Sequence, residues 1–544
     1  MPKTGAKSGP QIARCRPIWE EAEGWVVSGA NRVDTPSRGS DGLHGRGQSF
    51  TRNVWSYLWG KEARRIYASI FVENLRSGAE PSPATDVQQI ATAGRLPPVR
   101  LFGEPHPILF FSEDFPRAMT PYEFLGRYDD EQYNRDNRMV NGHFYPSSTL
   151  EVEEGETVGV LLLNLGGPDS EEAVEPFLYN LFMDPAIIDF SEVVYFQARG
   201  RVRQAFSKII SYFRSQSVAE DYKEISDDGG SPINPLTREQ ADNLEAQLNE
   251  QYAHTGADFK TYMAMRYWHP FSEEAAAQME EDGVDKVVLL PLYPQYSKTT
   301  TGASLVYWYE LEQAGEIPEW PTSFVFEYAT HPKYIEALSE RIDEGLARFP
   351  DDVRDDVHIL FSAHGTPLTE MKQRRDPYCC LVHSTVKHLM EHRGHDHDFT
   401  TAFQSKVGPS EWLTPATDDT VEALAEEGED VLVVPVAFVT DHIETSYELA
   451  IEIPEDLEEE GAPIPEHYEV MPGLNSHPKF IEALAEVTAA QLDLPNTETP
   501  APWSARPCYK SRERDIRCHQ CERIAEATDW SEETASEERT PAAA

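Results

Sequence analysis

A ten-residue segment that occurs twice constrains the fold more than any other feature of this sequence. HPKYIEALSE begins at His331, and HPKFIEALAE begins at His477, 146 positions later. The residues upstream of the two copies also correspond, because Pro291 and Pro435 occupy the same place in two similar apolar runs. The period is far too long for a solenoid, so the repeat predicts a chain built from two duplicated halves.

Short apolar runs alternate with helical patterns through both halves. Eight runs have the length of buried strands, and they lie at residues 158–163, 259–265, 286–292, 323–328, 357–361, 399–404, 431–438 and 467–472. Alternation of strands and helices predicts parallel sheets. The expected fold class is therefore α/β, with two Rossmann-like lobes at residues 151–329 and 330–495 and a cleft between them.

The charge of the chain excludes some classes of partner. The 544 residues carry 94 acidic and 47 basic side chains, a net charge of −47, which argues against binding to nucleic acid and against broad contact with anionic lipid. No apolar run reaches the ~18–20 residues that a membrane span needs, and the N-terminus lacks a secretory signal pattern. Six cysteines in so long a chain do not make a disulfide framework. We therefore expect a cytoplasmic protein.

The two ends of the chain differ from its middle. Residues 1–138 are rich in Gly, Pro, Ser and Arg, and they are far less acidic than the rest. We interpret them as a poorly ordered extension or as sequence upstream of a true start at Met139; a small independent binding domain is the alternative. Residues 496–544 form a C-terminal tail that carries a group of cysteines.

The strand predicted at 431–438 runs directly into a cluster of proton and metal ligands. His442 and Glu444 are two residues apart, Asp441 can orient an imidazole, and Glu448 follows Glu444 by one helical turn. Imidazole with carboxylate suits a borderline divalent ion such as Fe²⁺, and the imidazole can also accept protons near neutral pH. A solvated acidic helix face is the alternative interpretation of the two glutamates.

A second histidine is expected at the same edge. His364 follows the strand predicted at 357–361, in FSAHGTP, and Gly365 allows a close approach of backbone or ligand at that turn. A lone histidine after a strand is usually a hydrogen-bonded structural residue. Because the ends of parallel strands meet at one edge of a sheet, however, His364 is expected near His442 and Glu444.

Motifs along most of the chain resemble one enzyme family. They are LLLNLGGPDS, FLYNLFMDP, GGSPI, MRYWHP, YPQYSKTTTGAS, FSAHGTP, DPY, QSKVGP, WLTPATDDT and PVAFVTDHIETSYEL. In this order, from about Val158 to Leu484, they resemble ferrochelatase, which inserts Fe²⁺ into protoporphyrin IX in the last step of protoheme synthesis. The resemblance implies the two-lobed class II chelatase fold. It implies that His364 and Glu444 are the iron-binding and catalytic pair, flanked by Asp441, His442 and Glu448.

The resemblance also implies a porphyrin pocket. The matching positions are Leu165, Tyr222, Ser231, Arg266, Tyr296, Ser297 and Trp412. Arg266 could pair with a propionate, and Trp412 could stack on the macrocycle. In the related coproporphyrin-specific enzymes a Tyr tends to stand where this chain has Leu165, so protoporphyrin is the expected substrate. Ordinary core packing is the alternative for the aromatic residues.

Two further segments carry expectations. Residues 199–214 are basic and amphipathic in an otherwise acidic chain. The resemblance to ferrochelatase implies a lip over the porphyrin mouth at this place, and the basic amphipathic pattern suggests weak peripheral membrane contact; a plain surface helix is the alternative. Cys508, Cys518 and Cys521 resemble the C-terminal cysteines that hold a [2Fe–2S] cluster in some ferrochelatases. Such a cluster needs a fourth ligand, for which the candidates are Cys379, Cys380 and His519; free thiols or an adventitious Zn²⁺ site are the alternatives.

The function expected from the sequence is therefore ferrochelatase activity, with no cofactor required beyond the substrate Fe²⁺. Two alternatives remain open at this point. One is a chelatase of the same fold with another substrate, such as iron into coproporphyrin or cobalt into sirohydrochlorin. The other is a non-catalytic binder of haem or metal, which the retention of His364 with Glu444 argues against because a binder needs no base.

Overall fold

The computed structural model describes Tyr145 and residues 149–184, 186–187, 201–226, 228–374, 376–406 and 410–497. The predicted extension at 1–138 lies outside these residues, as does nearly all of the predicted tail at 496–544. By its internal contacts the chain divides into residues 1–49 and 50–544, and every described residue belongs to the second unit.

The first half of the described chain contains a four-stranded parallel sheet. Its strands are β2 (Thr157–Asn164), β3 (Asp258–Met265), β4 (Lys286–Pro291) and β5 (Thr322–Phe324), in the spatial order β3-β2-β4-β5. The central strand β2 is apolar and almost fully buried, as expected of a parallel strand covered by helices on both faces. The α/β prediction is confirmed for this half.

The second half repeats the first. Its sheet contains β6 (His358–His364), β7 (Phe399–Gln404), β8 (Val431–Pro435) and β9 (Tyr468–Val470), again parallel and in the order β7-β6-β8-β9. All eight predicted strands are present, although those predicted at 323–328, 431–438 and 467–472 are shorter than expected. Pro291 and Pro435 are the last residues of β4 and β8. The residue after each proline still bonds to the central strand, since Leu292 N–H donates to the Leu163 carbonyl at 2.8 Å and Val436 N–H to the Ser362 carbonyl at 2.9 Å.

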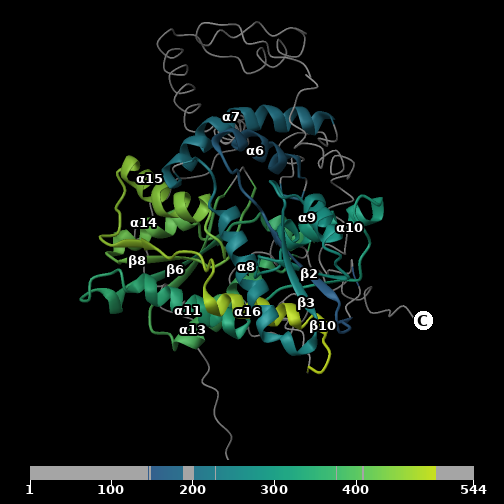
Figure 1. Cartoon of the computed structure of the whole chain (residues 1–544). Helices are drawn as coiled ribbons and strands as arrows, with labels where there is room; N and C mark the ends of the chain where they lie inside the picture. Colours follow the sequence, from purple (N-terminus) through teal and green to yellow (C-terminus); the bar gives the residue numbers. More distant parts are fainter. Residues whose placement is uncertain are drawn as a thin grey trace, which may run out of the picture. The chain divides into compact units, whose positions relative to one another are not determined.

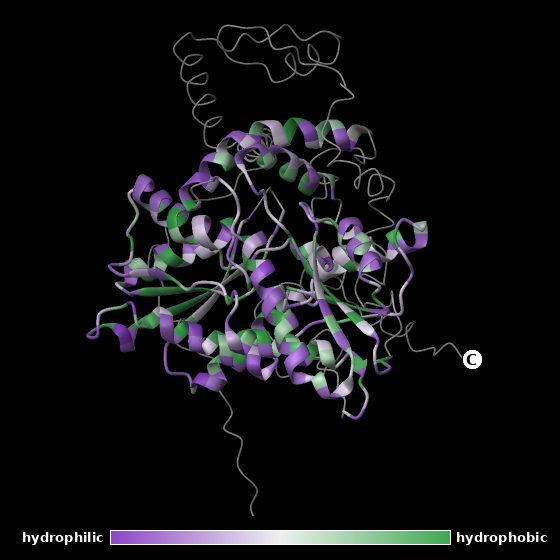
Figure 2. Ribbon diagram, in the orientation of Figure 1, coloured by the Kyte–Doolittle hydropathy of each residue, from purple (hydrophilic) through white to green (hydrophobic). Residues whose placement is uncertain are grey.

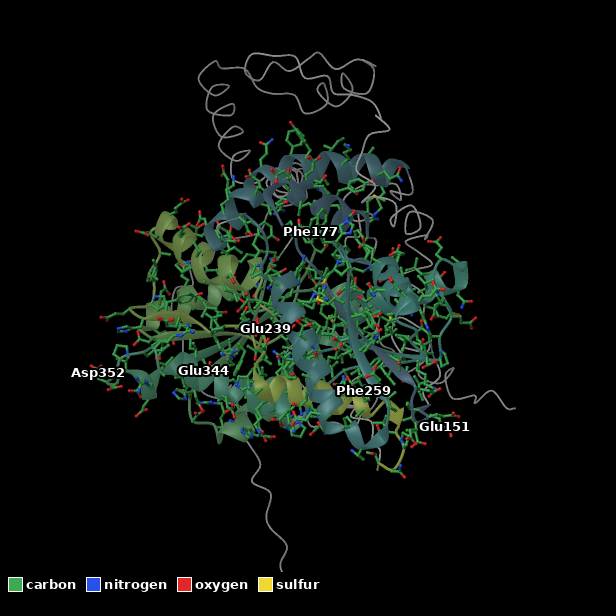
Figure 3. The ribbon with its side chains drawn as sticks, in the orientation of Figure 1. Glu151, Phe177, Glu239, Phe259, Glu344 and Asp352 are labelled. Atoms are coloured by element: carbon green, nitrogen blue, oxygen red, sulfur yellow. The ribbon has the colours of Figure 1, made fainter. Side chains whose placement is uncertain are left out.

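Helices connect the strands and cover both sheets (Figure 1). The α-helices are α6 (Val174–Met183), α7 (Arg201–Ile225), α8 (Ile233–Gln251), α9 (Ser272–Glu281), α10 (Ala303–Ala314), α11 (Pro332–Leu346), α12 (Leu368–Arg374), α13 (Tyr378–Arg393), α14 (Thr417–Glu427), α15 (Ile453–Glu460) and α16 (Pro478–Ala489). Two π-helical segments are η7 (Lys298–Gly302) and η9 (Glu444–Glu452). Figure 2 shows hydrophobic residues along the strands and hydrophilic residues on the outer helices.

The two lobes share one hydrophobic core. Leu162 of β2, Leu338 of α11 and Leu484 of α16 are buried members of the same apolar cluster. Helix α16 also packs against both α8 and α11, which lie with it along the junction of the two sheets (Figure 1). Two short parallel strands, β1 (Leu150–Glu151) and β10 (Leu492–Asp493), join the start of the first lobe to the end of the second. The lobes therefore fold against each other rather than as separate domains.

The repeated segment forms a pseudo-symmetric contact between the lobes. Its two copies are α11 and α16 with the residue before each helix, and these helices pack together. The reciprocal ion pairs are His331–Glu486, Lys333–Glu482, His477–Glu340 and Lys479–Glu336. His331 pairs with Glu486 as its counterpart His477 pairs with Glu340, and the two lysine pairs correspond in the same way. Such reciprocal contacts are the pattern of a two-fold symmetric interface. The repeat is therefore the contact surface between the halves.

Candidate active site

His364 is the last residue of β6, where the parallel strands of the second sheet end. Its neighbour in the strand register is Gln404, the last residue of β7. The Nδ1 atom lies 2.6 Å from the carbonyl oxygen of Gly365, and donation of the Nδ1 proton to that oxygen leaves Nε2 unprotonated. Burial lowers the pKa of His364, and the charge of Glu448 opposes this shift. The imidazole is therefore suited to accept a proton or to bind a metal ion.

The turn after His364 requires glycine. A Cβ atom at Gly365 would lie 2.7 Å from the carbonyl oxygen of Gln404 and 3.0 Å from the ring of Trp412. Trp412 also forms an isolated β-bridge with Pro367. The close approach predicted at Gly365 is thus confirmed, and the structure brings Trp412 against the turn that carries His364.

The segment after β8 enters a π-helix rather than the expected α-helical turn. Glu444 begins η9, and Glu448 lies within it. A π-helix closes its hydrogen bonds from residue i to i+5, and such segments occur frequently at functional sites. The wider turn keeps both glutamates on neighbouring parts of one helix, as the sequence predicted, although the type of helix differs.

Asp441 holds the loop that leads into η9. Its Oδ1 atom accepts hydrogen bonds from the Thr445 hydroxyl at 3.1 Å and from the Gly473 N–H at 2.8 Å. Its Oδ2 atom accepts from Asn475 Nδ2 at 2.8 Å, and its own N–H donates to Asn475 Oδ1 at 3.0 Å. The carboxylate is thus engaged in shaping the loop. Its predicted place in a proton relay remains a prediction.

His442 lies in the interior beside Glu444. Its Nε2 atom is 3.9 Å from Glu444 Oε2, and its ring centroid is 4.6 Å from that of Phe438. Nδ1 is buried and has no hydrogen-bond partner among the described residues. Burial lowers the pKa of His442 to about 4, with Asp441 opposing the shift. The ring is therefore neutral at pH 7, and one of its nitrogen atoms can serve as a ligand or proton acceptor.

Two carboxyl groups in η9 titrate near neutral pH. Burial raises the pKa of Glu444 to about 7. Burial and then the charge of Glu444 raise the pKa of Glu448 to about 7, while a hydrogen bond from Ser405 and the nearby His364 and Arg214 oppose this rise. The Oε2 atom of Glu444 is buried and accepts no hydrogen bond within the described part of the chain. A pair of interacting carboxyls with these pKa values is suited to pass protons at pH 7.

Tyr222 and Ser231 come together with these carboxyls. Tyr222 is buried in α7, and its pKa is raised by burial and then by the charges of Glu444 and Glu448. Ser231 is also buried, and its hydrogen bond with Tyr222 partly offsets that shift. Two of the predicted porphyrin-pocket positions therefore lie beside the predicted catalytic residues.

The loop after β2 contains Leu165. Its N–H donates to Asn164 Oδ1 at 2.9 Å, and Asn164 Nδ2 donates to Thr237 in α8 at 3.0 Å. At Gly167 a Cβ atom would lie 2.4 Å from the Cβ of Ser231, so the loop backbone packs directly on another predicted pocket residue. Leu165 is itself only partly buried. The structure thus links the Leu165 loop to Ser231.

Three other predicted pocket residues have partners inside the protein. The Nη2 atom of Arg266 is 2.7 Å from Asp184 Oδ2, and both side chains are buried. Tyr296 is fully buried and stacks on Phe326 at 4.1 Å between centroids. Ser297 donates its hydroxyl to a buried aspartate, Asp376, at 2.8 Å. Arg266 is therefore already paired with a carboxylate, and a contact between it and a propionate remains a prediction.

Sequence reasoning missed several residues near the site. Ser405 has a positive φ of 61° and donates its hydroxyl to Glu448 Oε2 at 2.9 Å. Tyr378 begins α13, and its pKa is raised by burial and then by the charge of Glu444. Arg214 of α7 is close enough to Glu448 to lower its pKa. Ser405 and Tyr378 belong to the motifs QSKVGP and DPY, but the motifs alone did not predict that Ser405 would lie beside Glu448 or Tyr378 beside Glu444.

The described residues contain neither a ready-made metal cluster nor a membrane-spanning helix. Within them no group of three or more His, Cys, Asp or Glu side chains is arranged to hold a metal ion. None of their helices is both long enough and apolar enough to cross a membrane. Cys508, Cys518 and Cys521, the predicted cluster ligands, lie outside the described residues.

Comparison with known proteins decides the family. The ferrochelatase family model matches residues 157–492, which is more than half of the chain. The chain belongs to the ferrochelatase family. The curated ferrochelatases of a Picosynechococcus species and of Gloeothece citriformis are each 41% identical to it, over 338 and 337 residues. These matches cover 62% of this chain and 83% and 82% of the two relatives.

A solved structure of SirB from Bacillus subtilis with Fe³⁺ was also found, with a TM-score of 0.33 and 13% identity over 60% of this chain and 93% of SirB. The predicted family, enzyme class and α/β fold are confirmed by the ferrochelatase match and by the two parallel sheets. The chain is a metal-chelating lyase, and its reaction is insertion of Fe²⁺ into protoporphyrin IX, the last step of protoheme synthesis.

Proposed function

We propose that this ferrochelatase reaction takes place where the ends of β6 and β8 bring His364, His442, Glu444 and Glu448 together. The observation that carries the proposal is the pair of buried carboxyls in η9 whose pKa values lie near 7, next to two histidines whose pKa values are lowered. A porphyrin must lose two N–H protons to accept Fe²⁺. A site with a neutral base and nearby carboxyls that exchange protons at pH 7 meets that need.

His364 is the proposed base. Its Nδ1 is bonded to the Gly365 carbonyl, so Nε2 is the nitrogen available to a pyrrole N–H. The lowered pKa keeps this nitrogen unprotonated at neutral pH, and the nearby Glu448 stabilises the imidazolium that forms. Glu444 and Glu448 would then carry the proton toward solvent, with Asp441 and His442 as the other members of the predicted relay.

Fe²⁺ as substrate would be held by Glu444 and by Nε2 of His364. That nitrogen would accept a pyrrole proton only after the iron has left it, because it has one lone pair. One imidazole nitrogen and one carboxylate suit Fe²⁺. The Oε2 atom of Glu444 has no competing hydrogen bond among the described residues. With only two protein ligands, the iron can leave for the four porphyrin nitrogens. This arrangement binds the metal for transfer rather than for storage.

The porphyrin would lie against residues from both lobes. Tyr222 and Ser231 supply hydroxyl groups beside η9, and Trp412 packs on the turn of His364. The other predicted wall positions are Leu165, Arg266, Tyr296 and Ser297. Arg214 adds a cation near Glu448, on the helix that carries Tyr222, and could pair with a propionate that Arg266 does not reach.

The test compares two histidines of the same strand. His364→Ala removes the proposed base, whereas His358→Ala changes a half-buried histidine at the other end of β6 that contacts Thr400. With protoporphyrin IX and Fe²⁺ under anaerobic conditions, we expect His364→Ala to lose at least about 100-fold in rate, as is usual when a general base is removed. Porphyrin binding, followed by fluorescence quenching, should persist in both variants. Full activity of His364→Ala would contradict the assignment.

The same assay tests the substrate. Coproporphyrin III with Fe²⁺, and sirohydrochlorin with Co²⁺, should be converted more slowly than protoporphyrin IX with Fe²⁺. If either is converted faster, the protein is the corresponding chelatase, for coproporphyrin or for sirohydrochlorin, and the proposed substrate is wrong. Binding of porphyrin without conversion of any substrate would favour a non-catalytic carrier.

We also propose weak peripheral membrane contact through α7 by a protein that resides in the cytoplasm. Ile209, Tyr212 and Phe213 are 54%, 52% and 41% exposed, and Lys208 and Arg214 lie next to them in the sequence. Exposed apolar side chains with flanking cations suit a membrane surface. Flotation with vesicles of phosphatidylcholine and phosphatidylglycerol should retain the wild type and lose the double variant Ile209→Ser, Phe213→Ser. Equal flotation of the two would contradict the proposal.

A [2Fe–2S] cluster on Cys508, Cys518 and Cys521 is a separate proposal. Two of the candidates for the fourth ligand, Cys379 and Cys380, lie at the start of α13. Cys379 is buried, with its sulfur 3.8 Å from His383 Nδ1, whereas the sulfur of Cys380 is bonded in a disulfide and could bind iron only after reduction. A bound cluster would add an electron-transfer group. Iron and sulfide analysis with EPR of the reduced protein should reveal the cluster in wild type and a loss in Cys518→Ala. Absence of acid-labile sulfide in the wild type would refute it.

A further inference from the structure

A buried carboxylate joins the two lobes close to the proposed site. Asp376 is 4% exposed, and its Oδ2 atom accepts hydrogen bonds from the Ser297 hydroxyl at 2.8 Å and from the Lys298 N–H at 2.7 Å. Its Oδ1 atom accepts from the Tyr378 N–H at 2.9 Å. Ser297 and Lys298 belong to the first lobe, whereas Asp376 and Tyr378 belong to the second. One carboxylate therefore receives three donors from both sides of the lobe junction.

The first-lobe partners lie at the start of a π-helix. Ser297 is the N-cap residue of η7, and its hydroxyl oxygen accepts the Thr299 N–H at 3.2 Å. The preceding residue is Tyr296, one of the predicted porphyrin-pocket positions. A change in the position of Ser297 would therefore move both η7 and the wall residue next to it.

The second-lobe partner lies beside the proposed metal ligand. Tyr378 is the first residue of α13, and it is buried. Its pKa is raised by burial, then by Glu444 and then by Asp376, so its hydroxyl end is near the Glu444 carboxyl. The carboxylate of Asp376 thus connects Ser297 of the first lobe to Tyr378, whose hydroxyl lies near Glu444.

The duplicated half gives an internal comparison. Ser231 and Asp376 stand at corresponding positions, since each is followed by the proline that caps the next helix, α8 or α13. The Ser231 hydroxyl accepts the Ile233 N–H at 3.4 Å, as Asp376 accepts that of Tyr378. A serine is therefore sufficient to cap the helix. The aspartate is longer and also reaches across the junction to Ser297 and Lys298. Burial raises the pKa of Asp376, and its three hydrogen bonds and the charge of Lys298 oppose that rise.

We propose that Asp376 is a positioning residue for the ferrochelatase reaction. Its carboxylate fixes the first-lobe wall at Ser297 relative to Tyr378 and Glu444, so that a porphyrin held by one lobe meets the metal and proton groups of the other. This role rests on the proposed site and adds to it a residue that acts through Ser297 and Tyr378 rather than on the substrate itself.

Asp376→Asn tests the proposal with almost no change in size. The Lys298 and Tyr378 partners are backbone N–H groups that can only donate, so whichever way the amide is oriented its NH₂ group faces one of them and that bond is lost. When the NH₂ group faces Lys298, the Ser297 hydroxyl must also turn from donor to acceptor. Loss of charge-assisted bonds of this kind predicts that the Kd for metal-free protoporphyrin IX rises about tenfold and that kcat falls. Asp376→Ser places at this position the residue that caps α8 in the first lobe, Ser231, so the bond to the Tyr378 N–H is expected to remain. Serine is too short to reach Ser297, so this variant should show the same rise in Kd.

The matched control is Asp430→Asn. Asp430 is a partly buried carboxylate that likewise accepts a backbone N–H, from His467 at 2.9 Å, but it lies before β8, at the opposite end of the sheet from His364. Its variant should lose stability without a change in Kd or kcat. If Asp376→Asn and Asp376→Ser unfold at lower temperature but bind and turn over porphyrin as wild type does, the role is only structural and the proposal is wrong. Failure of the wild type to insert iron would instead overturn the proposed function.

Discussion

Glu444→Gln should make the protein more stable at pH 8 while it removes activity. The carboxyl of Glu444 lies in the interior, where burial raises its pKa from the ordinary 4.5 to about 7. At pH 8 the folded protein must hold this group as an anion, which costs free energy compared with the unfolded chain. Glutamine has the same shape and no charge, so it avoids that cost.

The size of the effect follows from the two pKa values. The unfolded chain ionises Glu444 near pH 4.5, but the folded chain keeps the proton until about pH 7, so this group lowers stability as pH rises through that window. A rise from 4.5 to about 7 corresponds to about 3 kcal/mol at pH 8. The Glu444 side chain is 18% exposed, which reduces the expected gain to about 2 kcal/mol.

Urea unfolding of wild type and variant at pH 5 and pH 8, with a chelator present to remove metal ions, measures this gain. The variant should be nearly as stable as wild type at pH 5 and about 2 kcal/mol more stable at pH 8. Removal of the Glu444 charge also lowers the pKa of Glu448, which acts in the same direction. Glu455→Gln, in the exposed part of α15, is the control and should show no such difference. If Glu444→Gln gains no stability between pH 5 and pH 8, the carboxyl is not held in a low-dielectric site and the reasoning fails.

Three other predictions concern neighbouring parts of the molecule. Ser405→Gly removes the hydroxyl that lowers the pKa of Glu448, so the acidic limb of the kcat profile should move to higher pH; an unchanged profile would show that Glu448 does not control the limb. Gly365→Ala should reduce insertion by at least about tenfold and lower the melting temperature, since its Cβ would meet the Gln404 carbonyl; wild-type rates would mean that the turn can relax. Lys333→Glu should destabilise the lobe junction by about 1 kcal/mol, measured by urea unfolding, and a second change of Glu482 to Lys should restore it if the pair is real.

The strands and the two-lobed architecture could be predicted from the sequence, because buried strands appear as short apolar runs and the duplication appears as a repeated segment. Eight apolar runs marked eight strands, and the repeated HPK segments marked the two helices that join the lobes. The placement of His364 near His442 and Glu444 was also predictable. Residues that follow parallel strands meet at one edge of the sheet, whichever helices lie between them.

Contacts between residues far apart in the sequence were not predictable from one sequence. The bond from Ser297 to Asp376 joins residues 79 positions apart, and the pairing of Arg266 with Asp184 joins residues 82 positions apart. Helix and strand periodicity relates only residues that are a few positions apart, so it cannot predict either pair. Each pair depends on how distant segments of the chain pack together. The π-helical form of η9 was missed for a similar reason, because its pattern of residues is compatible with an α-helix.

The duplicated halves differ in charge at the positions where they are most alike in structure. Both halves place a π-helix after the second of the two central strands, η7 after β4 and η9 after β8. In the first half the buried Asp376 of the other lobe reaches the start of η7, and burial raises its pKa while hydrogen bonds from Tyr378, Lys298 and Ser297 and the charge of Lys298 oppose the rise. In the second half burial alone acts on the pKa of Glu444 and raises it to about 7. Hydrogen bonds to a carboxylate favour its ionised form, so a buried carboxyl that lacks them exchanges protons more readily near pH 7. The duplication therefore supplies one carboxylate that is bonded to both lobes and one carboxyl that can change its charge during the reaction.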